Sequence, residues 1–148
     1  MNVELNALAS VGYVTNWAAR LFARSIDREL KPIGVASGQL PVFFALEAGG
    51  PMTQATLARA AAVEQATMAA TLSRMERDGL LRRKPDPADR RSALIELTPL
   101  GQDKLVTIRA AVSRINARAM TQLSEHEQEQ YLRLVTKIIK ALSADGNL

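Results

Sequence analysis

The sequence contains no cysteine and only one histidine, and this scarcity excludes several kinds of chemistry. Without cysteine the chain has no disulfide, no thiolate zinc site, no thiol nucleophile and no cysteine-based redox sensor. A single histidine cannot build a multi-histidine metal centre and argues against a hydrolytic triad. That residue, His126, lies between Glu125 and Glu127 without a zinc-protease motif, which predicts an exposed residue in the first turn of a helix. We therefore expect no metal and no cofactor.

Long apolar runs are also missing. The two longest stretches without a charged residue cover residues 5–19 and 32–46, and both contain glycine and polar side chains, so neither predicts a membrane span. The first residues, Met1 to Glu4, lack the basic region of a secretory signal. Since no nucleophile–base pair or phosphate-binding glycine loop is visible, we expect neither catalytic residues nor enzyme activity. These absences predict a cytoplasmic protein without a membrane partner.

The basic residues are distributed unevenly. The net charge of +4, from 19 basic and 15 acidic residues, does not by itself indicate a nucleic-acid partner. Five basic side chains flank the turn-forming segment PDPAD at residues 85–89, and they are Arg82, Arg83, Lys84, Arg90 and Arg91. A charge cluster of this kind is commonly a solvated surface. On both sides of a turn, it also describes a hairpin whose positive loop would fit a phosphate-lined groove.

Helical periodicity dominates the first half of the chain. Residues 5–30 contain apolar side chains at helical spacing on more than one face, and Pro32 ends the pattern. Three further helices are predicted, over residues 37–48, 54–60 and 64–78. Thr53 is a favourable cap for the second of these. Two short helices joined by a tight turn, with an apolar stripe on the second, are typical of a helix-turn-helix motif.

A hairpin and two long helices follow. Two antiparallel strands and two helices are predicted, over residues 80–84, 92–97, 99–122 and 125–142. Thr98 is a favourable cap for the first helix, and residues 124–127 form a capping box for the last. The predicted fold is mainly α with a small β-hairpin wing. It comprises a winged helix-turn-helix over residues 35–98 and flanking helical regions at 1–34 and 99–148.

Three motifs are more specific than the periodicity. ERDGL at residues 76–80 ends the second helix of the helix-turn-helix, DPADRR at 86–91 forms the predicted wing, and LTPLG at 97–101 begins the next helix. Together with GPMTQ at 50–54, this combination resembles the MarR family of winged helix-turn-helix transcription regulators, over at least residues 36–105. The resemblance implies a protein that binds double-stranded DNA as a symmetric dimer.

The second helix of the helix-turn-helix is the expected DNA-reading element. Because Met68, Leu72 and Met75 form its apolar stripe, the helical period predicts an outward set consisting of Gln65, Ala66, Thr67, Ala70, Ser73, Arg74 and Arg77. A glutamine there can pair with adenine, and an arginine with guanine or phosphate. An ordinary amphipathic surface helix would show the same pattern. Where many family members carry a polar reader, this chain has Ala69 and Ala70, so we expect DNA shape to contribute to recognition.

The resemblance also implies roles within the wing. Arg91 would enter the minor groove, and Asp89 would orient its guanidinium group. The other basic residues would hold phosphates, and they are Arg82, Arg83, Lys84 and Arg90. Such contacts position a protein on DNA without reading its sequence. The alternative for Asp89 and Arg91 is a surface ion pair with no DNA role.

The helices at both ends carry more apolar surface than a small winged helix needs. In the family such helices form the dimer interface, and the alternative is that they complete the core of a monomer. A symmetric dimer implies a pseudo-palindromic operator with half-sites about 34 Å apart. The family also often binds phenolic ligands beside these helices. This implies ligand contacts by Tyr13, Trp17, Phe43 and Phe44, although an aromatic stripe is more often plain core.

Together these features predict a homodimeric DNA-binding transcriptional regulator. The simplest form is a repressor of neighbouring genes that a small, phenolic ligand releases from DNA. An activator would show the same motifs. The alternative from another class is a winged helix that contacts protein without sequence-specific DNA binding, and the arginine-flanked wing argues against it.

Overall fold

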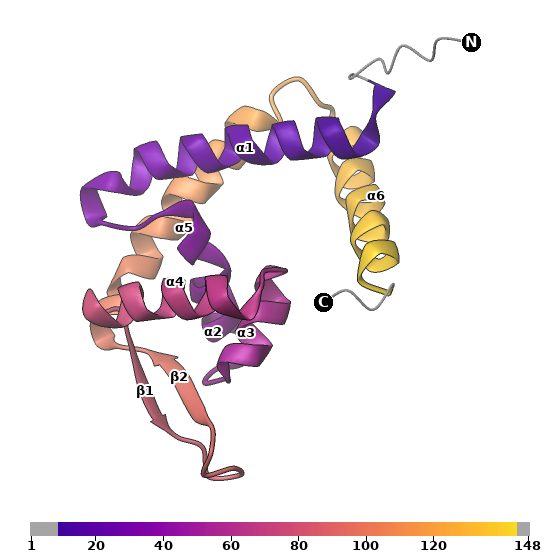
Figure 1. The fold of residues 1–148 in the computed structure, drawn as a ribbon. Coiled ribbons are helices and arrows are strands. Elements are labelled where there is room, and N and C mark those ends of the chain that lie inside the picture. The colour runs from indigo at the N-terminus through magenta and orange to yellow at the C-terminus, as the bar shows by residue number, and fades with distance from the viewer. Residues whose placement is uncertain (1–8, 145–148) are drawn as a thin grey trace.

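The structure is a computed structural model that describes residues 9–144 (Figure 1). The helices are α1 (Val11–Leu30), α2 (Leu40–Gly49), α3 (Gln54–Ala61), α4 (Gln65–Arg77), α5 (Pro99–Ala119) and α6 (Glu125–Ala144). The strands are β1 (Leu81–Pro85) and β2 (Ala93–Leu97), and short 3-10 turns cover η2 (Lys31–Ile33) and η3 (Ser37–Gln39). The predicted fold class is confirmed, because helices make up most of the described chain and a two-stranded antiparallel hairpin projects from them.

The first helix is shorter than its periodicity predicted. Ser10 has an extended backbone, and its side chain accepts a hydrogen bond from the Tyr13 N–H, so α1 begins at Val11. Residues 5–8 of the predicted helix lie outside the described part of the chain. The apolar spacing predicted a helix from residue 5, whereas the Ser10 cap places the start of α1 at Val11.

Three other helix starts lie where the sequence placed them. The Thr53 side chain accepts from the backbone of the first turn of α3, and Thr98 does the same for α5. Ser124 and Glu127 form a reciprocal capping box, in which each side chain accepts from the backbone N–H of the other. These caps satisfy N–H groups that the first turn of a helix leaves without partners.

The turn of the helix-turn-helix depends on one residue in an unusual conformation. Ala62 has a φ of 53°, in the left-handed region that costs an L-residue about 1–2 kcal/mol. There it ends α3, and its N–H donates to the Arg59 carbonyl over 3.1 Å. The next N–H, of Val63, donates to the Ala58 carbonyl, also over 3.1 Å. This reversal directs the chain from α3 into α4 within a few residues.

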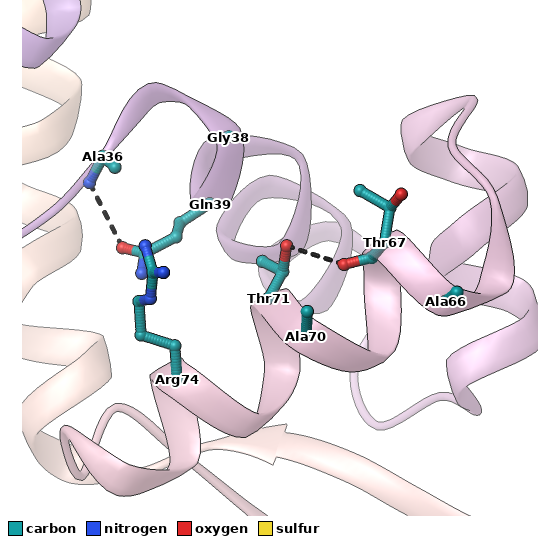
Figure 2. Close-up of a pocket in the computed structure, with 8 residues that line it drawn as sticks. All are labelled: Ala36, Gly38, Gln39, Ala66, Thr67, Ala70, Thr71 and Arg74. Carbon is teal, nitrogen blue, oxygen red and sulfur yellow. Dashed lines mark hydrogen bonds between the residues drawn. The ribbon is translucent and has the colours of Figure 1, made fainter.

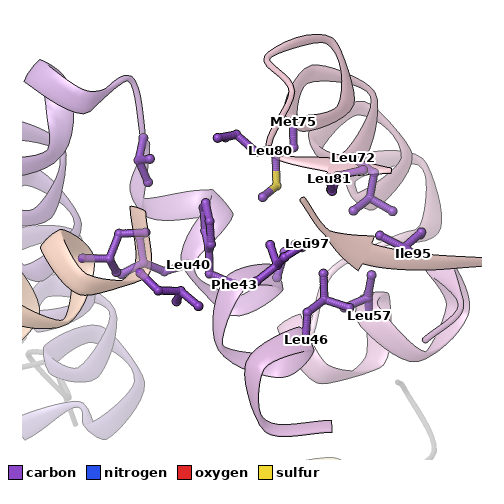
Figure 3. Packing of buried hydrophobic residues seen from close by; sticks show 14 of the residues in the cluster. Leu40, Phe43, Leu46, Leu57, Leu72, Met75, Leu80, Leu81, Ile95 and Leu97 are labelled. Carbon is purple, nitrogen blue, oxygen red and sulfur yellow. The ribbon is translucent and has the colours of Figure 1, made fainter. Parts of the chain in front are cut away.

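The core lies where α2, α3, α4 and the hairpin meet (Figure 3). Its largest fully buried side chains include Phe43, Leu57, Met68, Leu72, Met75 and Ile95. Each such side chain stabilises the fold by about 1.5–3 kcal/mol through burial. Leu30 of α1 and Ile108 of α5 belong to the same cluster. Packing is therefore continuous across residue 98, where the sequence placed a domain boundary.

The hairpin register separates an inner and an outer face. Leu81 lies opposite Leu97, and both are buried, while Arg82 lies opposite Glu96 on the other face. Met52 adds a bridge to Ile95, with backbone hydrogen bonds of 3.1 and 2.8 Å. The base of the hairpin is therefore fixed to the helices, while its tip projects.

The first turn of α5 lies against the base of the wing. Gly101 is buried, and a Cβ at this position would lie only 2.2 Å from the Leu80 carbonyl oxygen. The Thr98 N–H donates to that same oxygen over 3.1 Å, and the Thr98 hydroxyl donates to the Gly79 carbonyl over 2.5 Å. Glycine at position 101 is thus required for this close approach.

The terminal helices are packed much less completely. α1 lies along α5, and Arg114 of α5 bonds Glu29 of α1 over 2.9 Å. α6 contains no buried residue, and in Figure 1 it lies apart from α2, α3 and α4. Large apolar side chains are exposed on both helices, namely Val11, Tyr13, Val14, Trp17 and Leu21 on α1, and Tyr131, Leu132, Leu134, Ile138, Ile139 and Leu142 on α6.

Candidate nucleic-acid interface

Helix α4 presents one face to the core and the opposite face to solvent. Met68, Leu72 and Met75 are its buried residues, as the apolar stripe predicted. All members of the outward set are exposed, namely Gln65, Ala66, Thr67, Ala70, Ser73, Arg74 and Arg77. Ala69 is only partly exposed. The first turns of α4 therefore expose short side chains, which allow its backbone to come close to another surface.

The N-terminal end of α4 is connected to α3 by a side-chain pair. Gln54, the first residue of α3, donates through Nε2 to Oε1 of Gln65, the first residue of α4, over 3.3 Å. This contact fixes which end of the Gln65 amide faces its neighbour and leaves the Nε2 group of Gln65 to donate elsewhere. Sequence reasoning missed Gln54, because only the folded turn brings the two helix starts together.

A cavity of about 480 Å³ lies beside α4 (Figure 2). Small residues of α4 line one side of the cavity, and residues of the η3 turn line the other side. Among the latter, Gln39 is buried, with 4% exposure. The Gln39 Oε1 atom accepts from the Ala36 N–H over 3.2 Å, and the Thr71 hydroxyl donates to the Thr67 carbonyl over 3.1 Å. Arg74 lines the same cavity. The exposed face of α4 thus borders a hollow surface.

The stem of the wing carries three basic residues, and each has an acidic partner. The Arg82 Nε atom lies 2.7 Å from Glu96 Oε1, and the Lys84 Nζ atom lies 2.9 Å from Glu96 Oε2. On the other face of the hairpin, Arg83 lies 3.3 Å from Glu76 of α4. The family resemblance implied phosphate contacts for these three basic residues, and no local signal in the sequence pointed to either glutamate. Their pairing depends on strand register and on how the hairpin packs against α4.

The two basic side chains beside Glu96 lower the pKa of its carboxyl group. Hydrogen bonds from Lys84 and then from Arg82 hold the pKa of the Glu96 carboxyl below its ordinary value of 4.5. The carboxylate therefore stays ionised under neutral conditions, and both of its oxygens are occupied by the stem.

The tip of the wing differs from the stem. Arg90 and Arg91 are exposed, and neither forms an ion pair within residues 9–144. The Asp89 carboxylate accepts from the backbone N–H of Arg91 over 2.9 Å, instead of holding its guanidinium as the resemblance implied. Asp86 accepts from the Ala88 N–H in the same way, also over 2.9 Å. The two aspartates bond the turn backbone because that contact lies two residues along the chain.

The four aromatic residues predicted to contact a ligand lie in two different environments. Tyr13 and Trp17 are 48% and 45% exposed on α1, where their rings pack edge to face with centroids 6.0 Å apart. Phe43 is fully buried in the core, and Phe44 packs against that core. The predicted ligand residues are thus split between an exposed helix face and the interior.

Two other cavities lie along the terminal helices. One, of about 260 Å³, is bounded by α1 and α5, and the other, of about 350 Å³, by α1, α5 and α6. Phe22 lines both, and Tyr131 lines the second. Neither aromatic was predicted as a ligand contact, because only the packing of α1 on α5 brings Phe22 to these surfaces. Within residues 9–144 there is no helix long and apolar enough to cross a membrane, and no cluster of metal-binding side chains.

An exposed helix after a tight turn, followed by a projecting hairpin with a basic tip, defines a winged helix-turn-helix protein of the DNA-binding class. The sequence model of the MarR family matches residues 33–92. The chain belongs to the MarR family, as its motifs predicted, and this family consists of non-enzymatic DNA-binding transcriptional regulators.

Three similar proteins span most of the chain. The HTH-type transcriptional repressor NicR of Pseudomonas putida is 29% identical over 138 residues, which cover 93% of this chain and 87% of NicR. The crystal structure of the transcriptional regulator PA4135 is 30% identical, with a TM-score of 0.76, covering 88% of this chain and 96% of that one. BpsR of Bordetella bronchiseptica, whose DNA binding is regulated by 6-hydroxynicotinic acid, is 25% identical, with a TM-score of 0.78 and coverage of 86% and 97%.

Proposed function

We propose that this protein is a homodimeric transcriptional repressor that binds a pseudo-palindromic duplex and is released by a small aromatic ligand. The observation that carries the proposal is the combination of the exposed face of α4 with two exposed arginines at the wing tip that form no ion pair within the described residues. The DNA-contacting residues are those of the outward set of α4 and of the wing, with Arg90 and Arg91 at the tip. NicR, a repressor similar over most of its length, supports the direction of regulation.

The chemistry of these residues suits two different grooves. The first turn of α4 carries short side chains and the Gln65 amide, which can reach base edges in a major groove. Arg74 and Arg77 lie further along the same exposed face and suit phosphates. The exposed Arg91 at the wing tip suits a narrow, electronegative minor groove. A helix and a wing of one subunit would therefore contact neighbouring stretches of the same duplex.

A second copy of this chain is the partner that covers the terminal helices. α6 is a helix of 20 residues with its apolar side chains on one face and no buried residue. Such a helix gains little stability in water unless its apolar face is covered. The exposed apolar residues of α1 supply a second uncovered face, and a two-fold dimer would bury both. The dimer would place two α4 helices about 34 Å apart, one helical turn of DNA.

The ligand is proposed to bind beside the terminal helices. The cavities lined by Phe22 and Tyr131 are of a size that suits a single aromatic ring, and a bound ligand there would touch helices that the dimer also uses. Tyr13 and Trp17 remain proposed contacts, while Phe43 would need to leave the core to reach a ligand. The regulation of BpsR by 6-hydroxynicotinic acid supports an aromatic, acidic or phenolic effector.

One titration tests this function and its alternative. A labelled duplex from upstream of the coding sequence is titrated with protein at several salt concentrations, with a scrambled duplex as the control. We expect tight binding to the first duplex, and a logarithmic affinity that falls linearly with the logarithm of salt concentration. Equal, weak binding to both duplexes would instead favour a winged helix that contacts protein.

Effector release and dimerisation have their own measurements. The preformed complex is challenged with phenols, benzoic acids and 6-hydroxynicotinic acid, and at least one is expected to lower DNA affinity. Because Trp17 is the only tryptophan and is half-exposed on α1, its emission reports ligand binding without DNA. Sedimentation measures the oligomer, and a monomer at all concentrations would contradict the proposed dimer.

A further inference from the structure

Within the described part of the chain, the basic residues of the wing divide into a stem with ion-pair partners and a tip without them. Arg82 and Lys84 of β1 both bond Glu96 of β2, whereas Arg90 and Arg91 at the tip form no ion pair in the described chain. The division is set by the hairpin itself. It separates cations that share a carboxylate partner from cations that have no ion-pair partner within residues 9–144.

The position of Glu96 explains why it bonds two partners. It lies directly opposite Arg82 in the antiparallel register, and Lys84 is the next residue of β1 on the same face. The two carboxylate oxygens take one cation each, at 2.7 and 2.9 Å. The Glu96 side chain is 19% exposed, while those of Arg82 and Lys84 are 62% and 44% exposed. Glu96 thus lies beneath two cations that would otherwise extend toward solvent.

We propose that Glu96 limits the sequence-independent affinity of the wing: it withholds Arg82 and Lys84 from DNA phosphates, so that the wing contacts DNA through Arg90 and Arg91. This inference rests on the proposed DNA-binding function and changes the role expected for the stem. Phosphate contacts add affinity for every sequence and carry no sequence information. An internal carboxylate that occupies two cations therefore lowers affinity for operator and random DNA by a similar factor.

Glu96 should compete with DNA phosphates for Arg82 and Lys84 better than a glutamate on a flexible loop would. Its strand is paired along its length with β1, so its carboxylate is held beside both cations before DNA arrives. A phosphate would have to displace these contacts, and the charge that the stem offers to DNA is reduced by one. The stem cation on the other face, Arg83, is held by Glu76 of α4, so all three stem cations have partners.

Substitution of Glu96 by glutamine tests the proposal with little change in shape. The matched control is Glu129→Gln, which removes the same charge from an exposed position of α6. Affinity for the operator and for a random-sequence duplex is measured over a range of potassium chloride concentrations for both variants and the unmodified protein. Circular dichroism and thermal melting report whether each variant is folded.

The proposal predicts that Glu96→Gln gains affinity. Binding to random duplex should tighten on the order of three- to tenfold near physiological salt, and the salt slope should steepen by about 1 to 2. Affinity for the operator should rise by a similar factor, so the ratio of operator affinity to random affinity should stay nearly constant. Glu129→Gln should change neither the slope nor the affinity for random duplex. An unchanged slope in Glu96→Gln, or weaker binding to both duplexes, would overturn the proposal.

A second substitution tests the same point without changing Glu96. If Glu96 withholds Arg82, then Arg82→Gln should alter affinity for random duplex by less than about twofold in the unmodified protein. In the Glu96→Gln background the same change should remove about half of the gain, because a freed cation is then lost. Equal losses in both backgrounds would mean that Arg82 contacts phosphate despite Glu96.

Retention on heparin separates this inference from the proposed function. If the unmodified protein binds neither duplex, the proposed DNA binding fails. The salt concentration that elutes each variant from heparin still measures how many cations are available to a polyanion. Elution of Glu96→Gln at higher salt than Glu129→Gln supports the role of Glu96, and equal elution contradicts it.

Discussion

The winged helix and the terminal helices are built from similar residues but are packed very differently. In the winged helix, apolar side chains from three helices and two strands meet in a single buried cluster. In α6, within the described chain, no side chain is buried at all. Both regions show amphipathic periodicity, so sequence pattern does not distinguish them. The winged helix buries its apolar face within the chain, whereas the terminal helices leave many large apolar side chains exposed within residues 9–144.

This difference gives each region a separate experimental signature. Substitutions in the winged helix should lower the free energy of unfolding at every protein concentration. Substitutions on the apolar faces of α1 and α6 should act through assembly, so their effect should depend on concentration.

The largest expected effect is that of Phe43→Ala, since Phe43 is fully buried in the core. Removing the ring should cost about 3–5 kcal/mol of unfolding free energy, from lost burial and the remaining cavity. Urea unfolding at two protein concentrations measures this loss of unfolding free energy. The matched control is Trp17→Ala, an aromatic residue 45% exposed on α1, whose effect should vary with concentration. A concentration-independent loss of similar size at Trp17 would remove the distinction between the two regions.

Ile138→Asp should have the next largest effect, on dimerisation. Ile138 is 38% exposed on the apolar face of α6, and a carboxylate there would be buried without a partner in the proposed dimer. We expect a loss of about 2–4 kcal/mol of association free energy, with the winged helix still folded. Analytical ultracentrifugation and circular dichroism measure the two quantities. An unchanged dimer would place the interface elsewhere.

Arg91→Ala should lower operator affinity by about 1–3 kcal/mol and leave unfolding unchanged. The side chain lies exposed at the wing tip, and no ion pair within residues 9–144 holds it. Fluorescence anisotropy with the operator duplex measures the loss, and Arg82→Ala is the comparison from the paired stem. If Arg82→Ala lowers operator affinity as much as Arg91→Ala does, the stem and the tip contribute equally to DNA binding. The proposed contrast between them would then be wrong.

The smallest expected effect is the pH dependence of the wing. Lys84 and Arg82 lower the pKa of Glu96 below 4.5, so the ionised carboxylate stabilises the folded hairpin. This contribution is complete above 4.5 and is lost as the pH falls through the lowered pKa. The melting temperature of the protein should therefore exceed that of Glu96→Gln at neutral pH, and the two should converge in acid. A constant difference at all pH values would contradict this.

Local signals predicted most helices and both strands of the fold, and the face of α4 that is exposed. The period of Met68, Leu72 and Met75 was sufficient to predict which face of α4 is exposed, because a helix fixes side-chain direction. Thr53 and Thr98 identified helix starts, because capping is a contact within one turn.

Contacts between elements could not be predicted in the same way. Glu96 faces Arg82 only because the strands pair in one register, and a shift of a single residue would place Glu96 on the other face. Gln54 meets Gln65 only after the chain reverses at Ala62 in a left-handed conformation, which alanine rarely adopts. The Asp89 carboxylate bonds the backbone of Arg91, and the motif alone favoured the guanidinium.

The close approach at Gly101 couples the orientation of the wing to the orientation of α5. Because the first turn of α5 is packed and hydrogen-bonded against the Leu80 carbonyl, the base of the wing should move together with this end of α5. α5 has 21 residues, and a helix of that length spans about 31 Å. If its far end is held, a tilt of about 5° moves the wing by about 3 Å, the rise of two helical residues. An angular change at the terminal helices is thus amplified into a translation at the tip.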